Sequence, residues 1–288
     1  MIIAIIGPTC SGKSILADYV ANTINGLVVN FDAFQVYKEM NIGTAKPTSD
    51  EIKAKNYSLY NIVNVDDNFD VSKYQKVCRE FLALHQKDNI VLVGGTGLYL
   101  KASLFDYHFE EEDPMPKNYL ENIENNELYS RLFNIDEEDA RKIGPNNRKR
   151  LLRALFIYET HNKTKSEINN NGKNTLLYPG VIFLGLDIPR ETLYENINKR
   201  VENMFANGLE EEVNYLFKKY GKDNRSLQAI GYKEFNNDLS NLDRKELIKK
   251  NTRNYAKRQM TFFKHQFNGV KWFSSIEEAK NYVKDNLK

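Results

Sequence analysis

The chain has 288 residues, of which 41% are hydrophobic and 28% charged, and its formal net charge is +2. This length can bury the core of one large domain, or of a domain that carries a smaller second one. No apolar run reaches the roughly 18 residues that a membrane span needs, so we expect a cytoplasmic protein with no membrane partner. The charge alone does not indicate nucleic-acid binding. The two cysteines, Cys10 and Cys78, lack the spacing of a disulfide framework or a zinc site.

The clearest motif is at the N-terminus, where an apolar run at 2–6 is followed by GPTCSGKS at 7–14 and by apolar residues at helical spacing. This order predicts a strand, a phosphate-binding loop and a helix. Backbone N–H groups and the helix dipole favour an anion at such a loop. Lys13 adds a cation, and the Ser14 hydroxyl can hold Mg²⁺. The residues expected to bind the phosphates are Gly7, Pro8, Thr9, Cys10, Ser11, Gly12, Lys13 and Ser14.

The motif leaves two questions open. A chance glycine-rich turn is the alternative to a phosphate-binding loop, although the flanking strand and helix patterns argue against it. The loop also does not identify its ligand, because nucleotides and diphosphate esters present the same oxygens. No acid follows the later strand at 90–93, where the sequence has Gly94-Gly95-Thr96-Gly97. That absence argues against a motor ATPase or a GTPase.

A second buried strand is predicted at 26–32, GLVVNFD, and it ends on Asp32. Ligands of open parallel sheets bind beyond the carboxyl ends of the strands, so Asp32 is expected beside the phosphate-binding loop. The polar, aperiodic segment from 33 to 51 is interpreted as an ordered functional loop closed by Pro47. A further strand is expected at 60–65, YNIVNV.

Helices and strands then alternate. Asp70 is expected to cap a helix with apolar residues from 71 to 82, and a strand at 90–93 precedes a helix that starts near Leu98. This alternation predicts an α/β fold, in which a parallel sheet carries helices on both faces.

The pattern changes between 106 and 180, which we interpret as a helical insertion with its own core and a helix at about 147–160. The catalytic core is then expected to comprise 1–105 and 181–288. Its second part begins with a strand at 181–188 and a helix opened by Pro189, and further helices run through about 218, 244 and 265. A last helix follows a capping box formed by Ser274 and Ser275 with Glu277 and Glu278.

Two basic groups are candidates for contacts with phosphates of a nucleic acid. The first is Arg148, Lys149, Arg150 and Arg153, and the second runs from 249 to 264 with six Lys or Arg, no acid, and aromatic residues between them. A solvated helix face is the ordinary explanation of such runs. Basic side chains interleaved with aromatic rings also suit RNA, and the sequence alone leaves both explanations open.

These residues resemble the bacterial-type tRNA dimethylallyltransferases, also called tRNA isopentenyltransferases. The resemblance covers almost the whole chain and rests on GPTCSGKS at 7–14, FDAFQVYKEMNIGTAKP at 31–47, LVGGTGLYLKA at 92–102, NRKRLLRAL at 147–155, LDIPRETLYENINKRVENMFANGLEEEV at 186–213, AIGYKEF at 229–235 and NTRNYAKRQMTFF at 251–263. It implies a P-loop kinase-like fold with a helical insertion. It also implies transfer of the dimethylallyl group from dimethylallyl diphosphate to N6 of adenosine 37, next to the anticodon of tRNA, with release of diphosphate. The loop would then hold the prenyl donor instead of ATP.

The resemblance implies roles for individual residues. Asp32 would be the general base, and Thr9, Lys13 and Arg200 would complete the catalytic set, with Mg²⁺ on Ser14 as cofactor. Contacts with the tRNA anticodon stem-loop would come from Asp32, Ala33, Phe34, Gln35, Thr96, Lys149, Arg150, Leu151, Leu152, Arg153, Gln228, Gly231, Tyr232, Lys233, Arg253, Lys257, Arg258 and Gln259. Three positions depart from the family pattern, namely Ala33, Phe156 and Phe262. They put in doubt a hydroxyl contact and the aromatic packing against RNA.

Two other functions remain open from the sequence. A P-loop small-molecule kinase that uses ATP would explain the first 35 residues equally well, but it assigns no role to the basic groups. A non-catalytic RNA-binding protein would need no base at Asp32. We expect the protein to act as a monomer.

Overall fold

The computed structural model describes residues 1–109, 115–116, 118–164, 167 and 175–287. It divides into two compact units, one made of Met1–Leu104 with Tyr178–Lys288 and the other of Phe105–Leu177. The sequence pattern suggested 106–180 for the second unit. No helix of the described residues is both long enough and apolar enough to cross a membrane.

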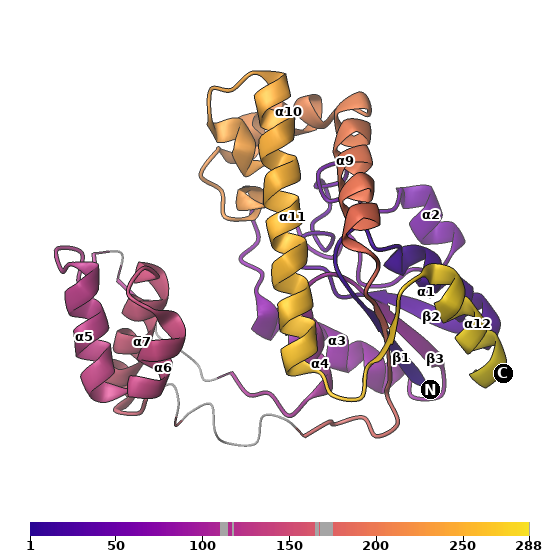
Figure 1. Cartoon of the computed structure of the whole chain (residues 1–288), viewed down its shortest axis with the longest axis horizontal. Helices are drawn as coiled ribbons and strands as arrows, with labels where there is room; N and C mark the ends of the chain where they lie inside the picture. Colours follow the sequence, from indigo (N-terminus) through magenta and orange to yellow (C-terminus); the bar gives the residue numbers. More distant parts are fainter. Residues whose placement is uncertain (110–114, 117, 165–166, 168–174, 288) are drawn as a thin grey trace. The chain divides into compact units, whose positions relative to one another are not determined.

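The first unit is built on one parallel sheet (Figure 1). Its strands are β1 (Ile2–Ile6), β2 (Gly26–Asn30), β3 (Asn89–Val93), β4 (Ile182–Leu186) and β5 (Lys271–Phe273), in the order β2-β3-β1-β4-β5. In the register of the central strand, Ile3 lies opposite Val91 of β3 and Ile182 of β4. Runs of buried aliphatic residues form such strands because parallel sheets are covered on both faces.

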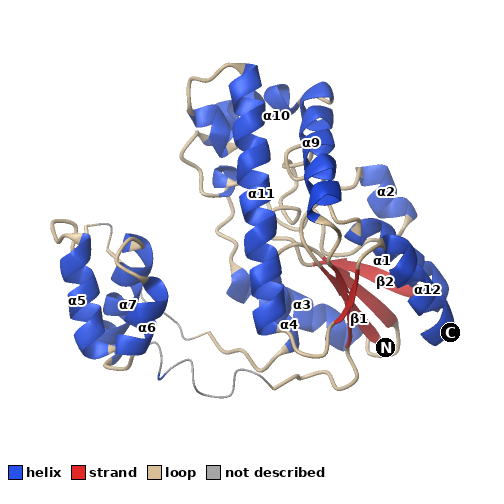
Figure 2. Ribbon diagram, in the orientation of Figure 1, coloured by secondary structure: helices blue, strands red, loops and turns tan. Residues whose placement is uncertain are grey.

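Helices cover both faces of the sheet (Figure 2). On one face, α1 (Lys13–Ile24) and α12 (Ile276–Asn286) pack against side chains of all five strands, including Ile3 and Ile5 of β1. On the other face lie α3 (Val71–Leu84) and α4 (Gly97–Leu104). Burying an aliphatic side chain fully between these layers contributes about 1.5–3 kcal/mol to the free energy of folding. The predicted α/β fold with helices on both faces is therefore confirmed.

Two helices, α3 and α12, begin at the capping residues expected from the sequence. The Asp70 carboxylate accepts a hydrogen bond from Lys73 N at 3.0 Å, as expected for the N-cap of α3. At α12, Ser275 Oγ accepts from Glu278 N at 3.2 Å. The Glu278 carboxylate reaches back to Ser274 N at 2.8 Å, so the expected box is closed one residue earlier than in the standard form.

Two expectations about elements are wrong. The strand expected at 60–65 is absent, and this segment makes an isolated bridge between Tyr37 and Val63. Leu59 and Asn61 have φ of 61° and 54°, which interrupts any ladder because strands need negative φ. The helices expected to end near 244 and 265 are one continuous helix, α11 (Asn241–Gln266), capped by Ser240.

The remaining helices of the first unit follow Pro189 or lie in connecting segments. They are α2 (Ser49–Ala54), α9 (Arg190–Ala206), α10 (Leu209–Tyr220) and the short 3₁₀ helices Ser226–Gln228 and Lys233–Asn236. The helix after Pro189 was expected, whereas α2 was not. It starts with a capping box between Thr48 and Glu51 inside the segment interpreted as a loop.

The second unit contains α5 (Asn125–Ile135), α6 (Glu137–Ile143) and α7 (Arg148–His161), labelled in Figure 1. Its separate core includes Leu128, Leu132 and Leu151. The guanidinium of Arg148 donates to the carbonyls of Leu120, Glu121 and Ile123. Arg148 therefore holds this unit together, and it is unavailable for the phosphate contact that the basic cluster suggested.

Candidate active site

A cavity of about 800 Å³ lies at the carboxyl ends of β1, β2 and β3, within the first unit. The loop after β1 contributes Thr9 to Ser14, Asp32 follows β2, and Gly94 and Gly95 follow β3. This is the edge at which parallel sheets bind their ligands. Asp32 and the phosphate-binding loop thus line one cavity, as expected for residues at the carboxyl ends of parallel strands, although β3 lies between β1 and β2.

The loop has the backbone that an anion cradle requires. Gly7 and Gly12 have φ of +145° and +92°. A Cβ on Gly12 would lie 2.3 Å from Cδ1 of Ile276, so α12 packs closely against the loop and a larger residue would displace the Ile276 side chain. Ser11 lines the cavity, and its buried Oγ has no hydrogen-bond partner among the described residues. The loop therefore leaves polar groups unsatisfied where phosphate oxygens would lie.

Lys13 is folded back onto this loop, where its Nζ donates to the Pro8 carbonyl at 2.6 Å. Burial lowers the pKa of Lys13 to about 8; electrostatic interactions with Cys10 and Asp32 oppose that effect, and the charge of Arg200 adds to it. A diphosphate beside it would favour the ammonium form again. The position suits a cation that stabilises a bound polyanion.

The two carboxylate oxygens of Asp32 differ in their hydrogen bonds. Its Oδ1 accepts hydrogen bonds from Phe34 N at 2.9 Å and Gln35 N at 3.4 Å. No hydrogen bond to Oδ2 occurs among the described residues, and this atom lies against Gly95, where a Cβ would approach it to 2.9 Å. The carboxylate is therefore oriented through Oδ1, while Oδ2 remains able to accept a proton.

Two tyrosines surround Asp32 without competing for that proton. Burial, and then the charge of Asp32, raises the pKa of both Tyr60 and Tyr255 above the ordinary value of 10.0. Both phenols therefore stay neutral near pH 7. Among the described residues that line the cavity, Asp32 is the one that carries a carboxylate.

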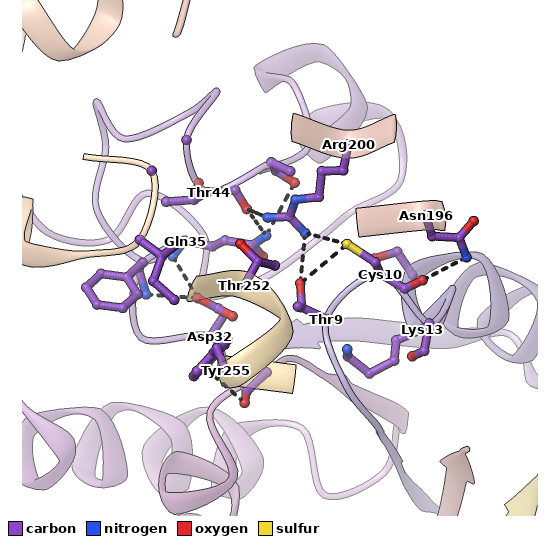
Figure 3. A pocket seen from close by; sticks show the side chains of 18 of the residues that line it. Thr9, Cys10, Lys13, Asp32, Gln35, Thr44, Asn196, Arg200, Thr252 and Tyr255 are labelled. Atoms are coloured by element: carbon purple, nitrogen blue, oxygen red, sulfur yellow. Dashed lines mark hydrogen bonds between the residues drawn. The ribbon is translucent and has the colours of Figure 1, made fainter. Parts of the chain in front are cut away.

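Arg200 enters the cavity from α9 and joins two loops (Figure 3). Its Nη1 donates to Thr9 Oγ1 and its Nη2 to the Thr44 carbonyl, both at 3.0 Å. One turn earlier, Asn196 Nδ2 donates to the Cys10 carbonyl at 3.1 Å. Asn196 was missed from the sequence, although its i,i+4 spacing to Arg200 places the two on one helix face.

Gln259 and Thr96 fasten the loops to each other. Gln259 Oε1 accepts from Thr9 N at 2.8 Å, and its Nε2 donates to the Gly95 carbonyl at 2.8 Å. Thr96 Oγ1 accepts from Ala33 N at 2.9 Å. The resemblance assigned both residues to tRNA contacts, and here their polar groups hold the cavity walls. Gln259 is only 5% exposed, so little of it remains for RNA.

Most of the other predicted tRNA contacts divide into three groups, and Lys233 is half-buried in a 3₁₀ helix. Residues that line the cavity are Phe34, Gln35, Gln228, Gly231 and Arg258. Residues of α7 in the second unit that are exposed or half-buried are Lys149, Arg150, Leu152 and Arg153. Residues whose side chains are fully buried are Leu151, in the core of the second unit, and Tyr232. The side chains of Leu151 and Tyr232 therefore offer RNA no surface.

Several side chains of the basic run on α11 are engaged by other parts of the protein. Lys249 pairs with Glu202 and Glu246 at 2.7 Å each, and Lys264 pairs with Asp187 at 2.7 Å. The partners Glu202 and Asp187 come from distant parts of the chain. Arg253 donates to Asn198 at 2.6 Å, while Lys257 is exposed and has no ion pair among the described residues.

The described residues contain no cluster of three or more His, Cys, Asp and Glu side chains that could hold a metal ion. Ser14 lines the cavity directly after Lys13. Mg²⁺ commonly takes one or two protein oxygens and completes its shell with water and phosphate oxygens. The residues present fit such an ion only together with a bound diphosphate.

Comparisons with known proteins agree on one family. A family model described as IPP transferase matches residues 35–266. A tRNA dimethylallyltransferase of Bacillus subtilis is 38% identical over 94% of this chain and 90% of its own length. One of Oceanobacillus iheyensis is 37% identical, over 99% of this chain and 96% of its own.

Two solved structures resemble the fold. A tRNA isopentenylpyrophosphate transferase from Staphylococcus epidermidis has a TM-score of 0.71 at 35% identity, and the match covers 99% of this chain and 98% of that one. A eukaryotic dimethylallyltransferase acting on tRNA has a TM-score of 0.82 at 28% identity, covering 99% of this chain and 76% of that one. The family model over residues 35–266 and the relatives at 37% and 38% identity over almost the whole chain lead to one conclusion: the chain belongs to the tRNA dimethylallyltransferase family.

Proposed function

We propose that this protein transfers the dimethylallyl group of dimethylallyl diphosphate to N6 of adenosine 37 in tRNA and releases diphosphate. The observation that carries the proposal is the shared cavity, which both the phosphate-binding loop and Asp32 line. A donor held by its diphosphate in the loop and an acceptor amine beside Asp32 would meet inside that cavity.

The leaving group gains negative charge as the bond between the allylic carbon and the diphosphate oxygen breaks. Lys13 and the backbone N–H groups of residues 12–14 lie beside the position of that charge, and Arg200 approaches it from α9. Donors arranged before the reaction stabilise developing charge without reorganising. The Ser14 hydroxyl would hold Mg²⁺, which neutralises charge on diphosphate oxygens.

The acceptor is an exocyclic amine, and it must lose a proton as the new carbon–nitrogen bond forms. Asp32 Oδ2 takes this proton, while Oδ1 keeps the carboxylate in place through Phe34 N and Gln35 N. The amine nitrogen gains the five-carbon group, and diphosphate leaves with the bonding electrons. The adenine must leave its stack in the anticodon loop to enter the cavity.

We propose that tRNA is held electrostatically by the exposed basic side chains, with Lys257 on α11 and Lys149 and Arg150 on α7 as the main candidates. With tRNA as substrate, the enzyme is proposed to work in the cytoplasm. Every group that the reaction needs belongs to one chain, which supports a monomer. A P-loop kinase would share the loop and Asp32, but the family to which the chain belongs does not favour it.

Single-turnover transfer tests the proposal. Purified protein is mixed with Mg²⁺, labelled dimethylallyl diphosphate and an anticodon stem-loop that contains A36-A37-A38, and a stem-loop with A37→G serves as control. We expect label on the A37 RNA alone. A folded protein that labels neither RNA but consumes ATP in a parallel assay would replace this proposal with the kinase.

A further inference from the structure

Glu212, on the first turn of α10, lies outside the lining of the cavity but holds one of its walls. Its Oε2 accepts hydrogen bonds from Asn41 N at 3.1 Å and Ile42 N at 2.8 Å, and its Oε1 accepts from Gly43 N at 3.0 Å. Three consecutive N–H groups thus converge on one carboxylate. Tyr232 also donates its hydroxyl to Oε1, at 2.7 Å.

The segment that Glu212 holds needs such support. Tyr232 is completely buried, and its ring packs so closely on Gly43 that a Cβ there would lie 2.4 Å from Cε2 of the ring. Two residues later, Ala45 has φ of +47°, a left-handed conformation that costs a non-glycine residue about 1–2 kcal/mol. The hydrogen bonds to Glu212 therefore stabilise a backbone that would otherwise relax.

This backbone in turn orients Arg200. Gly43, Thr44 and Ala45 line the cavity. The Thr44 carbonyl accepts both Arg200 Nη2 at 3.0 Å and Gln35 Nε2 at 3.1 Å. Since Arg200 Nη1 contacts Thr9 Oγ1 and Cys10 Sγ, the Thr44 carbonyl is the anchor that holds Nη2 and so helps set the plane of the guanidinium (Figure 3). A shift of residues 41–45 would turn that plane away from the phosphate-binding loop.

We propose that Glu212 is a positioning residue for the transfer reaction. By holding residues 41–43 it places the Thr44 carbonyl, and through this carbonyl it aligns Arg200 with the leaving diphosphate. The inference rests on the proposed function and extends it to a residue that touches neither substrate. Displacing a catalytic group by about 1 Å reduces rates by about 100-fold, so a distant anchor has a measurable effect.

Glu212→Gln is the informative substitution. All four neighbours of the carboxylate donate hydrogen bonds to it. An amide replaces one acceptor oxygen with NH₂, and this group would face N–H or O–H donors without being able to accept their hydrogen bonds. Glu211→Gln is the matched control, because it makes the same charge change in the same turn at an exposed side chain. We expect Glu212→Gln to lower the single-turnover rate about 10- to 100-fold, and Glu211→Gln to leave it within twofold.

A double-mutant cycle with Arg200→Ala separates positioning from general support of the fold. If Glu212 acts through Arg200, Glu212→Gln slows the Arg200→Ala enzyme by less than twofold, because no guanidinium remains to be misplaced. Equal losses in both backgrounds would overturn the inference, as would full activity of Glu212→Gln or of Arg200→Ala. Tyr232→Phe removes one hydrogen bond to Glu212 and gives a milder variant, expected to lose about threefold only when Arg200 is present.

The controls keep this inference separate from the proposed function. A wild-type protein that fails to modify the A37 stem-loop contradicts the proposed function itself. A wild-type protein that is active while the cycle shows no coupling contradicts only the role of Glu212. Thermal melting of each variant identifies any that do not fold. If Glu212→Gln does not fold, Tyr232→Phe takes its place in the double-mutant cycle.

Discussion

The Oε1 atom of Gln259 accepts a hydrogen bond from the backbone N–H of Thr9 at 2.8 Å, so helix α11 is joined directly to the phosphate-binding loop. The amide nitrogen of the same side chain donates to the Gly95 carbonyl at 2.8 Å. One buried side chain therefore connects the loops after β1 and β3 with the helix that carries the second basic group.

Gln259→Ala is expected to weaken the binding of dimethylallyl diphosphate about tenfold. The substitution leaves Thr9 N without its acceptor and frees the loop, a loss of about 1–2 kcal/mol. Calorimetric titration of the donor without RNA measures the change. His265→Ala, at an exposed position of the same helix, is the control. If both variants bind equally well, the loop keeps its shape without Gln259.

Asp32→Asn should abolish the base while keeping the local structure. The Asn side-chain oxygen can still accept from Phe34 N and Gln35 N, and only the oxygen at Oδ2 is replaced. We expect the single-turnover rate to fall by about 10² to 10⁴, as is typical for loss of a general base, with donor affinity retained. Near-normal turnover of this variant would assign the proton to another acceptor.

Lys257→Ala is expected to weaken tRNA binding and to reduce the dependence of log Kd on log salt by about 1. Lys257 is exposed on α11 without an ion pair among the described residues, and an unpaired cation can neutralise a phosphate. Lys249→Ala is the contrasting variant, because Glu202 and Glu246 already neutralise Lys249. Filter binding across a salt series measures both slopes, and equal slopes would make the α11 face an ordinary solvated surface.

The features that were predictable are those set by local sequence. The loop at 7–14, the cap at Asp70 and the strand that ends beside Asp32 each depend on a few consecutive residues. Arg200 is different, because it reaches the loop through a contact between residues 191 positions apart. Only the family resemblance, and no local pattern, pointed to it.

The same distinction explains the errors. The run on α11 contains no acid, yet Glu202 and Asp187 fold back to neutralise two of its lysines. On α7, Arg148 of the first basic group binds carbonyls and the neighbouring Leu151 packs in a core, because one face of this helix must be buried. Residue type at helical spacing identifies a face, and only tertiary packing decides whether that face meets solvent.

Stability should rise with pH through the titration of Lys46. Its Nζ donates to the carbonyls of Tyr37 and Lys38, and burial lowers its pKa from 10.5 to about 8, an effect that the charge of Glu212 opposes. Between pH 8 and 10.5 the unfolded chain holds this proton and the folded chain does not, so the free energy of unfolding increases with pH across that window.

Comparison with Lys46→Met isolates this contribution. Urea unfolding is measured at pH 7.5, 8.5 and 9.5. The free energy of unfolding of the wild type should increase relative to that of the variant as the pH rises, since methionine does not titrate. A difference that is constant over this range would mean that Lys46 has the same pKa in both states.

The two ends of the helical unit meet, because Phe105 pairs with Leu176 and Asp106 N donates to the Thr175 carbonyl at 2.8 Å. This closure has a consequence for synthesis on the ribosome. Strand β1 needs β4 on one side, and β4 is made only after the whole helical unit. The unit has its own core, so it can fold as soon as it emerges from the ribosome. At that stage the sheet still lacks β4 and β5. Once the unit has closed, β3 and β4 are joined by a short effective tether instead of a long chain, which lowers the entropy cost of completing the sheet.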